Sequence, residues 1–290
     1  MGLFGSLKSM IGGGRVDLDE RFEKLREAIS GTMAEFHKAR DRKTDRIVGL
    51  KVLDPQKLAA FEGRFKGLTK PSEGEILGQL DHPNIVKLIE YGIATNRRHY
   101  IVMEFIDGPG LNSVILSDPK EARPKRLSYL RQAGEALAAV HKAGFLHRDI
   151  CPRNFVVTPD YQTIKLIDFG LAVPLTPPFM QPGNRTGTPN YMAPELVKRQ
   201  ATDQRVDVFA FGSTAYELLT KQLPWERGTD GLAAMQHAQH APKHIHEYRP
   251  KLNGPLAAAI MKCVQQNPER RCRSIDEFLK MIRDVKQEEG

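Results

Sequence analysis

The chain has 290 residues, of which 40% are hydrophobic and 27% charged, and it carries a formal net charge of +8 at pH 7. This length and composition suit one globular domain built from two lobes, and they exclude a small disulfide-stabilised fold and a low-complexity chain. The positive charge suits an anionic ligand or an acidic partner surface, but no long Lys/Arg block is interleaved with aromatic residues, so we expect no nucleic-acid partner.

The first fourteen residues differ from the rest of the chain. Apolar side chains at positions 3, 4, 7, 10 and 11 would share one face of a helix, and the glycines at 12–14 would end it. Three interpretations are open: an interfacial anchor through residues 1–11 that contacts a membrane, myristoylation of Gly2 within a Met-Gly-x-x-x-Ser pattern, or a flexible, loosely docked tail. The tail is the plainest interpretation.

Short strand-like runs begin at Phe22. Residues 36–40 and 47–53 flank a turn-rich segment, which predicts a hairpin, and a helix around Glu73 to Leu80 follows. Further elements are predicted as strands at 86–91 and 100–105, and as helices at 127–140, at 206–219 and from Pro255.

The turn-forming sequence Asp107-Gly108-Pro109-Gly110 marks a boundary between two lobes. We therefore expect an α+β fold. It would have a flexible tail over 1–14, a small β-rich lobe over 15–106 and a larger, mainly helical lobe over 107–290.

The cysteines are odd in number and form no C-x-x-C pair; they are Cys151, Cys263 and Cys272. They indicate neither a disulfide framework nor a zinc site, and they favour a reducing compartment, so we expect a cytoplasmic protein. The longest apolar stretches are far shorter than the ~20 residues that span a membrane. Residues 1–14 also lack the basic start and apolar segment of a secretory signal.

A group of polar residues with specific spacing carries the chemistry. His147-Arg148-Asp149 is followed by Asn154, and Asp168-Phe169-Gly170 begins nineteen residues after Asp149. Phosphoryl transfer needs a carboxylate to orient the attacking hydroxyl and oxygen ligands for metal ions. Asp149 can accept the hydroxyl proton, whereas Asn154 and Asp168 can hold metal. The combination is highly specific.

The sequence thus resembles the eukaryotic-type, or Hanks-type, Ser/Thr protein kinases, over about residues 22–285. The resemblance implies a bilobal kinase fold with a helix C in the smaller lobe, and ATP with Mg²⁺ or Mn²⁺ as cofactors. It also implies transfer of the γ-phosphate to Ser/Thr hydroxyls of protein substrates. Met33-Ala34-Glu35, preceded by Thr32, is similar to a loop common in bacterial members.

Further positions match the family pattern in the smaller lobe. Val48-Gly49-Leu50-Lys51 resembles the strand whose lysine binds the α/β-phosphates, so the resemblance implies an ion pair between Lys51 and the helix-C residue Glu73, with Glu75 as a weaker alternative. Met103 would guard the back pocket. The backbone of Glu104 and Ile106 would hydrogen-bond adenine, and Val156 would form the floor beneath it.

Matches in the larger lobe concern the segment that Asp168 opens and Ala193-Pro194-Glu195 closes. The resemblance implies that Glu195 pairs with Arg271 and that Asp207 ties its helix to the catalytic loop. Thr188, in Gly187-Thr188, is the threonine that Ser/Thr kinases carry, so it favours that substrate class.

The glycine-rich loop departs from the family pattern. Its template aligns with residues 29–36, and of its glycines only Gly31 is present. Phe36 replaces the valine that roofs adenine, and Gly49 replaces the usual alanine. The ring of Phe36 either turns outward over the loop, which we favour, or fills the adenine pocket.

The catalytic loop departs as well. Cys151 replaces the lysine that neutralises the γ-phosphate, and Arg153, two positions further on, could supply the missing charge. Two hypotheses follow: an active Ser/Thr kinase, or a pseudokinase that acts as a nucleotide-binding or scaffolding module. A small-molecule kinase of related fold is a weaker third. The sequence does not indicate an oligomeric state.

Overall fold

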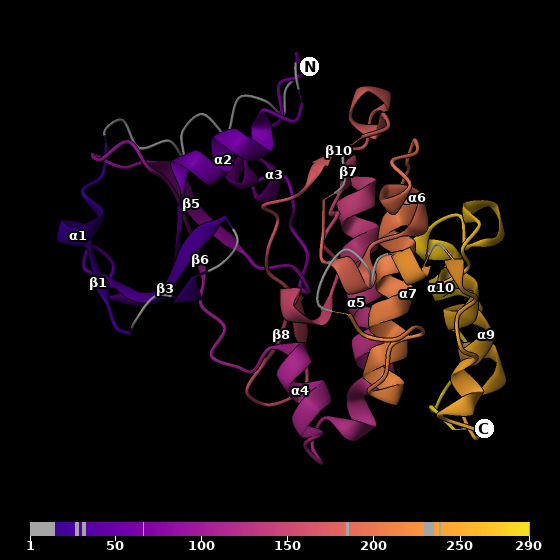
Figure 1. Cartoon of the computed structure of the whole chain (residues 1–290). Helices are drawn as coiled ribbons and strands as arrows, with labels where there is room; N and C mark the ends of the chain where they lie inside the picture. Colours follow the sequence, from indigo (N-terminus) through magenta and orange to yellow (C-terminus); the bar gives the residue numbers. More distant parts are fainter. Residues whose placement is uncertain are drawn as a thin grey trace, which may run out of the picture. The chain divides into compact units, whose positions relative to one another are not determined.

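The computed structural model describes residues 15–26, 29–30, 33–65, 67–183, 186–228, 235–237 and 239–289. The chain divides into two compact units (Figure 1), one formed by Met1–His82 with Val86–Asp107 and the other by Pro83–Ile85 with Gly108–Gly290. The change at Asp107 lies one residue beyond the lobe boundary that the sequence suggested. Pro83–Ile85 belongs to the second unit because the Asn84 side chain donates hydrogen bonds to Gln132 Oε1 at 2.8 Å and to the Ile164 carbonyl at 2.9 Å.

The first unit is built on one antiparallel sheet in the order β1-β3-β4-β6-β5, with β2 paired to β3. Its strands are β1 (Phe22–Lys24), β2 (Ile29–Ser30), β3 (Ala34–Asp41), β4 (Arg46–Leu53), β5 (Leu88–Ile93) and β6 (His99–Glu104). The predicted hairpin is confirmed as β3 and β4, in register from Ala34 opposite Leu53 to Asp41 opposite Arg46.

Side chains alternate between the two faces of this sheet. One face carries a buried apolar cluster that includes Phe22, Leu50 and Val102. The other face carries Phe36, Gly49 and Lys51, because Phe36 is opposite Lys51 and Gly49 is two residues along the same strand. The residues that match the kinase pattern therefore share one face.

The described residues of the first unit also form three short helices: α1 (Leu18–Arg21), α2 (Pro55–Glu62) and α3 (Glu73–Leu77). Asp54 caps α2 ahead of a proline in its first turn. Ser72 and Glu75 form a capping box at the start of α3, which fixes where that helix begins. The helix ends at Leu77, three residues earlier than predicted.

The second unit is mainly helical. The α-helices whose bounds the described residues give are α4 (Leu111–Ser117), α5 (Arg126–Lys142), α6 (Pro194–Val197), α7 (Arg205–Thr220), α9 (Gly254–Cys263) and α10 (Ile275–Met281). Nearly every side chain of α7 is buried, so it is the central helix, and the Phe211 and Phe278 rings join α7 to α10 with centroids 4.8 Å apart. The predicted helices at 127–140, at 206–219 and from Pro255 correspond to α5, α7 and α9.

In the described part of the second unit, four short strands form two antiparallel pairs. The pairs are β7 (Phe145–Leu146) with β10 (Val173–Pro174), and β8 (Phe155–Val157) with β9 (Ile164–Leu166). They position the loops on either side of them, which contain Asp149 and Asp168. The α+β fold class predicted from the sequence is confirmed by these two units.

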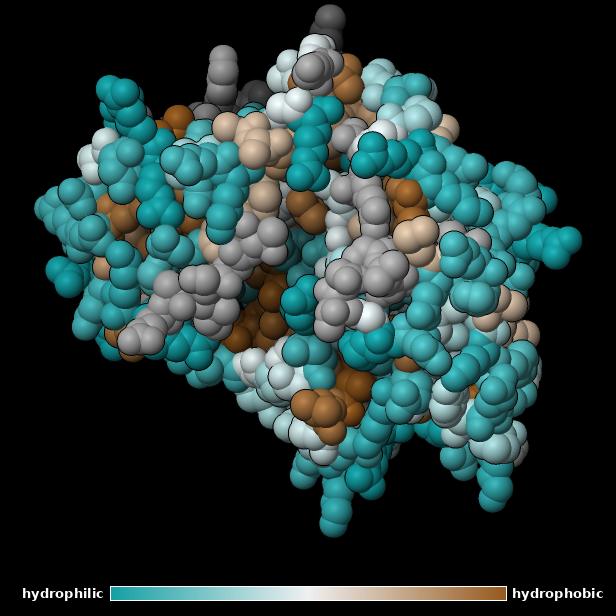
Figure 2. All heavy atoms as spheres, in the orientation of Figure 1, coloured by the Kyte–Doolittle hydropathy of each residue, from teal (hydrophilic) through white to brown (hydrophobic). Residues whose placement is uncertain are grey.

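The surface in the view of Figure 2 is mostly hydrophilic, with smaller hydrophobic areas between hydrophilic residues. None of the helices in the described part of the chain is both long and apolar enough to cross a bilayer. The predicted tail over residues 1–14 lies outside the described residues.

Candidate active site

The ion pair predicted between Lys51 and Glu73 is present in the first unit. Lys51 Nζ lies 2.7 Å from Glu73 Oε1, and both side chains are buried. The weaker alternative, Glu75, accepts the Ser72 backbone N–H at 2.7 Å in the capping box. Gly74 lets α3 approach β5 closely, because a Cβ at that position would lie 2.4 Å from the Tyr91 ring. The register of α3 therefore selects Glu73 as the partner of Lys51.

A second lysine that the sequence analysis missed lies near this pair. Burial lowers the pKa of Lys70, while the charge of Glu73 acts in the opposite direction and the charge of Lys51 adds to the lowering. Lys70 Nζ donates to the Pro71 carbonyl at 3.0 Å. Its only sequence signal is its place three residues before Glu73.

The Phe36 ring does not take the outward orientation that we favoured. A Cβ built on Gly49 would lie 2.8 Å from Phe36 Cζ, 2.9 Å from Cε2 and 3.1 Å from Met103 Cγ. The ring thus packs across Gly49 on the sheet face that also carries Lys51, in space that an alanine at 49 would occupy. The physical reason is the missing Cβ, which lets a diagonal cross-strand neighbour settle on the backbone. Gly31 lies outside the described residues.

The other residues predicted to contact adenine occupy separate places in the fold. Met103 is buried in β6, opposite Gly49. Glu104 ends the same strand, where its N–H donates to the Lys87 carbonyl at 3.0 Å, and Ile106 follows it. Val156 lies in β8 of the second unit, bridged to Gly110.

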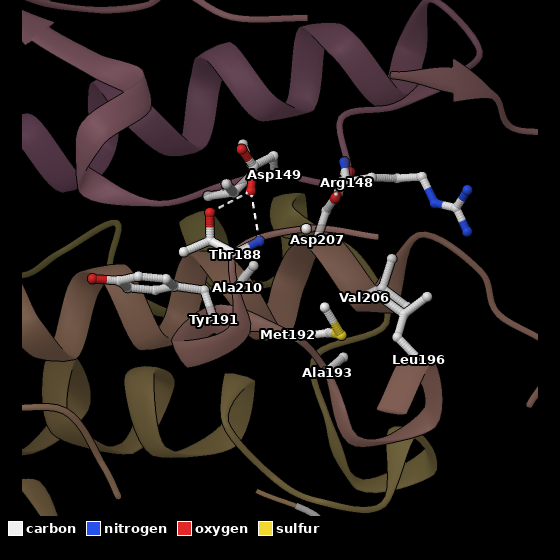
Figure 3. Close-up of a pocket in the computed structure, with 12 residues that line it drawn as sticks. Arg148, Asp149, Thr188, Tyr191, Met192, Ala193, Leu196, Val206, Asp207 and Ala210 are labelled. Atoms are coloured by element: carbon white, nitrogen blue, oxygen red, sulfur yellow. Dashed lines mark hydrogen bonds between the residues drawn. The ribbon is translucent and has the colours of Figure 1, made fainter. Parts of the chain in front are cut away.

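In the second unit, the Asp149 carboxylate is held on both oxygens. Thr188 donates its backbone N–H at 2.8 Å and its hydroxyl at 2.7 Å to Asp149 Oδ1 (Figure 3). Asn154 Nδ2 donates to Oδ2 at 2.9 Å and to the Asp149 carbonyl at 2.6 Å. Gly187 permits this approach, because its φ is +122° and a Cβ would lie 2.7 Å from the Arg148 carbonyl.

Asp207, in the first turn of α7, holds the backbone of this loop as predicted. Its carboxylate accepts the N–H groups of His147 and Arg148, both at 2.8 Å, and faces His141 Nε2 at 3.0 Å. Burial alone would raise the pKa of Asp207, but the bonds with His141 and the backbone keep it below the ordinary value. Arg148 has a φ of +66°, a strained conformation for a non-glycine residue, and the carboxylate stabilises it.

The Arg148 side chain points away from Asp149 and Thr188 (Figure 3). It is 4% exposed, and its Nε and Nη1 have no hydrogen-bond partner among the described residues. Burial lowers the pKa of Arg148 to about 10, against the charge of Asp207. A buried cation with unpaired N–H groups is costly, so it favours an anion nearby.

Arg153 and Cys151 both approach the Thr188 hydroxyl. Arg153 Nη2 donates to Thr188 Oγ1 at 3.2 Å, and Cys151 Sγ lies 3.8 Å from the same oxygen. Burial, followed by the charge of Asp149, raises the pKa of the Cys151 thiol to about 12, so the thiol is neutral. The exposed, charged guanidinium of Arg153 is therefore linked to Asp149 through the Thr188 hydroxyl, which bonds to both.

Asn154 and Asp168, which the sequence predicts as metal ligands, each carry side-chain oxygen atoms. The two bonds from Asn154 Nδ2 fix the amide so that its oxygen faces away from Asp149. Asp168 follows β9 and accepts the Gly170 N–H at 2.9 Å. Across the described residues, no three His, Cys, Asp or Glu side chains gather to hold a metal alone. One carboxylate and one amide oxygen suit Mg²⁺, which also uses water and phosphate oxygens.

The predicted link between Glu195 and Arg271 is present and deeply buried. Arg271 Nη2 donates to Glu195 Oε2 at 2.7 Å, and the same guanidinium reaches the carbonyls of Gln265 and Gln266. The Arg271 guanidinium also lies 4.8 Å from the centroid of the Phe209 ring. This ion pair anchors the end of the segment that contains Thr188.

Comparison with known proteins supports the interpretation of these residues as those of a protein kinase domain. A probable serine/threonine-protein kinase of Clostridium acetobutylicum is 31% identical over 93% of this chain and 40% of its own length. The serine/threonine-protein kinase pkn2 of Myxococcus xanthus is 31% identical over 90% of this chain and 32% of its own. The serine/threonine-protein kinase PknB of Mycolicibacterium smegmatis is 30% identical over 90% of this chain and 42% of its own length.

The chain thus spans less than half the length of these curated relatives. The family model described as "Protein kinase domain" matches residues 22–282, almost the range that the resemblance suggested. The chain belongs to the protein kinase domain family.

Proposed function

We propose that this chain is an ATP-dependent protein kinase that transfers the γ-phosphate to serine or threonine hydroxyls of protein substrates. The observation that carries the proposal is the Asp149 carboxylate, held by Thr188 on one oxygen and by Asn154 on the other. A carboxylate fixed in this way can accept the proton of a hydroxyl that attacks the phosphate. The names of the bacterial relatives support the same substrate class.

Each remaining site residue has a role in this proposal. Lys51, oriented by Glu73, binds the nucleotide phosphates, and Arg153 offsets the charge that develops on the transferred phosphoryl group. Asn154 and Asp168 hold Mg²⁺ or Mn²⁺, which neutralises phosphate charge when bound. Gly31, Phe36, Gly49 and Met103 line the nucleotide, the backbone of Glu104 and Ile106 recognises adenine, and Val156 contacts its other face.

The Thr188 hydroxyl is poised to select the substrate class. It donates to Asp149 and accepts from Arg153, so it links the general base to the cation. An incoming serine or threonine hydroxyl must compete for the same carboxylate oxygens. We infer that these short side chains reach Asp149 while Thr188 stays in place.

A pseudokinase is the alternative function. Two residues support it: Phe36 replaces the valine that the family places above adenine, and Cys151 replaces a positively charged lysine. The intact set of Lys51, Asp149 and Asp168 supports an active enzyme instead, and so do the relatives' names. We also propose that the chain works in the cytoplasm, in line with three free cysteines.

A radiolabelled-ATP assay on the purified chain with generic protein substrates tests the proposal. We expect label on serine and threonine, dependent on Mg²⁺ or Mn²⁺. The Asp149→Asn protein should lose it, whereas Asp276→Asn, a matched change at an exposed aspartate of α10, should retain it. Label on tyrosine alone, or ATP binding without any transfer, would contradict the proposal.

A further inference from the structure

Two cysteines that play no part in the proposed chemistry lie against each other in the second unit. Cys263 is the last residue of α9, and Cys272 follows Arg271. Both are completely buried, and their Sγ atoms are 3.7 Å apart. The Cys272 Sγ also lies 3.9 Å from the Met281 Sδ. This pair is not part of a metal cluster among the described residues.

We propose that Cys263 and Cys272 form a reversible disulfide under peroxide, and that this bond weakens the anchorage of Glu195 through Arg271. The Sγ atoms must approach by about 1.7 Å to reach the disulfide bond length of about 2.05 Å. Only nine positions separate the two residues in sequence, and both thiols already face one another. The coupling to activity rests on the proposed kinase function, but the bond itself does not.

The packing around Cys263 decides which residue moves. A Cβ on Gly212 of α7 would lie 2.5 Å from Cys263 Cβ, so α9 and α7 are in backbone-level contact at this point. Cys263 is therefore held by the central helix. Most of the approach falls on Cys272, which lies in a non-helical segment between Pro268–Arg270 and α10.

Movement of Cys272 acts on Arg271 because the two are adjacent. The Arg271 guanidinium bonds Glu195 Oε2 at 2.7 Å, the Gln265 carbonyl at 2.6 Å and the Gln266 carbonyl at 2.9 Å. The first two distances are at the short end of the hydrogen-bond range and the third is at its centre, so we expect a shift of more than an ångström at the neighbouring residue to lengthen at least one of these bonds. Glu195 closes the segment that delivers Thr188 to Asp149.

The chemistry balances with hydrogen peroxide, which is close to water in size, as oxidant. The thiolate of one cysteine attacks a peroxide oxygen, which gives a sulfenic acid and hydroxide. The second thiol then attacks the sulfenic sulfur with loss of its proton, forms the S–S bond and expels hydroxide. With two protons, both hydroxides leave as water, so two thiols and one peroxide give one disulfide and two waters. The bond from the Cys263 thiol lowers the pKa of Cys272, which makes Cys272 the first to react.

The test is peroxide treatment of the full chain, with alkylation, peptide mapping and the kinase assay on the same samples. We expect a cross-linked Cys263–Cys272 peptide, a loss of about threefold or more in rate, and recovery of both with dithiothreitol. Cys263→Ala and Cys272→Ala should each give no cross-link and keep their rate in peroxide. Cys151→Ala should still form the cross-link.

The outcomes separate the two proposals. Unlinked thiols in folded protein after prolonged peroxide would overturn the disulfide, as would a bond that involves Cys151. A cross-link with an unchanged rate would overturn the coupling to Glu195. A chain without any kinase activity would contradict the proposed function, yet peptide mapping would still decide whether the bond forms.

Discussion

The contact between Phe36 and Gly49 predicts a strong energetic coupling between these two positions. Gly49→Ala would place a Cβ 2.8 Å from Phe36 Cζ and 3.1 Å from Met103 Cγ. Gly49 cannot retreat, because β4 is paired with β3 on one side and β6 on the other. Overpacking of this kind costs about 1–3 kcal/mol. We therefore expect Gly49→Ala to lower the free energy of unfolding in the wild-type background.

The effect of Gly49→Ala on the free energy of unfolding should change sign when the Phe36 ring is removed. In a Phe36→Val background the Cβ at 49 meets no ring, and alanine in a strand is favoured over glycine by about 0.5–1 kcal/mol. The coupling energy in the double-mutant cycle, the difference between these two effects, should then be about 1.5–4 kcal/mol. Urea unfolding of the four proteins measures it directly.

A matched control comes from the same sheet. A Cβ on Gly92 of β5 would lie 3.2 Å from the Tyr100 ring, so Gly92→Ala is also crowded but involves other atoms. It should not couple to Phe36→Val. Equal effects of Gly49→Ala in both backgrounds, with a coupling below about 0.5 kcal/mol, would refute the packing argument.

The same proteins bear on the choice between kinase and pseudokinase. The ring lies over Gly49 on the sheet face that carries Lys51, so Phe36→Val tests directly whether it occludes the nucleotide. For an active kinase we expect ATP affinity to change by less than about tenfold, or about 1.4 kcal/mol. Calorimetry with Mg-ATP measures the change. A much larger gain in affinity would mean that the ring occludes the nucleotide, and would favour the pseudokinase.

Further predictions concern the second unit. Asp149→Asn should leave the unfolding midpoint near wild type and lower turnover by about 10²–10⁴, and near-normal turnover would remove Asp149 from the mechanism. Asp168→Ala should weaken Mg-ATP binding, and an unchanged affinity by calorimetry would exclude its metal role. Phosphopeptide mapping after incubation with ATP should find phosphate on exposed Thr176 and not on Thr186, whose hydroxyl is buried; phosphate on Thr186 would show that this segment opens. Burial lowers the pKa of His237 below about 6.5, the value for an exposed histidine. The buried neutral imidazole therefore contributes its full stability above about pH 6.5, and this contribution declines as the pH falls toward the folded-state pKa. The melting temperature of a His237→Gln protein should depend less on pH than that of wild type.

Much of the site was accessible from sequence because its geometry is local or fixed by family spacing. Asp149 and Asn154 are five residues apart in one loop, and the structure bonds them directly. The pairs Lys51–Glu73 and Glu195–Arg271 are distant in sequence, and only the resemblance could propose them. The roles of these residues toward ATP and metal stay predictions. The resemblance to the kinase family places an activation phosphosite at Asn184, which cannot be phosphorylated, and this position lies outside the described residues.

The parts that sequence could not predict depend on packing between side chains. The orientation of Phe36 follows from a cross-strand gap whose size no pattern states. Lys70 became relevant because its segment folds back beside Glu73, and Cys263 and Cys272 meet because α9 and the following segment pack on α7. Helix ends were also missed, since α3 ends at a glycine cap after Leu77 where the apolar period continued to Leu80.

The replacement of a catalytic-loop lysine by Cys151 has a consistent electrostatic solution. The Cys151 side chain is completely buried, and a charge in such a place needs a partner of opposite charge. With a neutral thiol there, Asp149 keeps its two oxygens for Thr188 and Asn154, and the cation moves to the exposed Arg153. Arginine retains its charge at any working pH and binds phosphate bidentately. The charged group of this loop that reaches the Thr188 hydroxyl is therefore the exposed Arg153, while Asp149 stays bonded to Thr188 and Asn154.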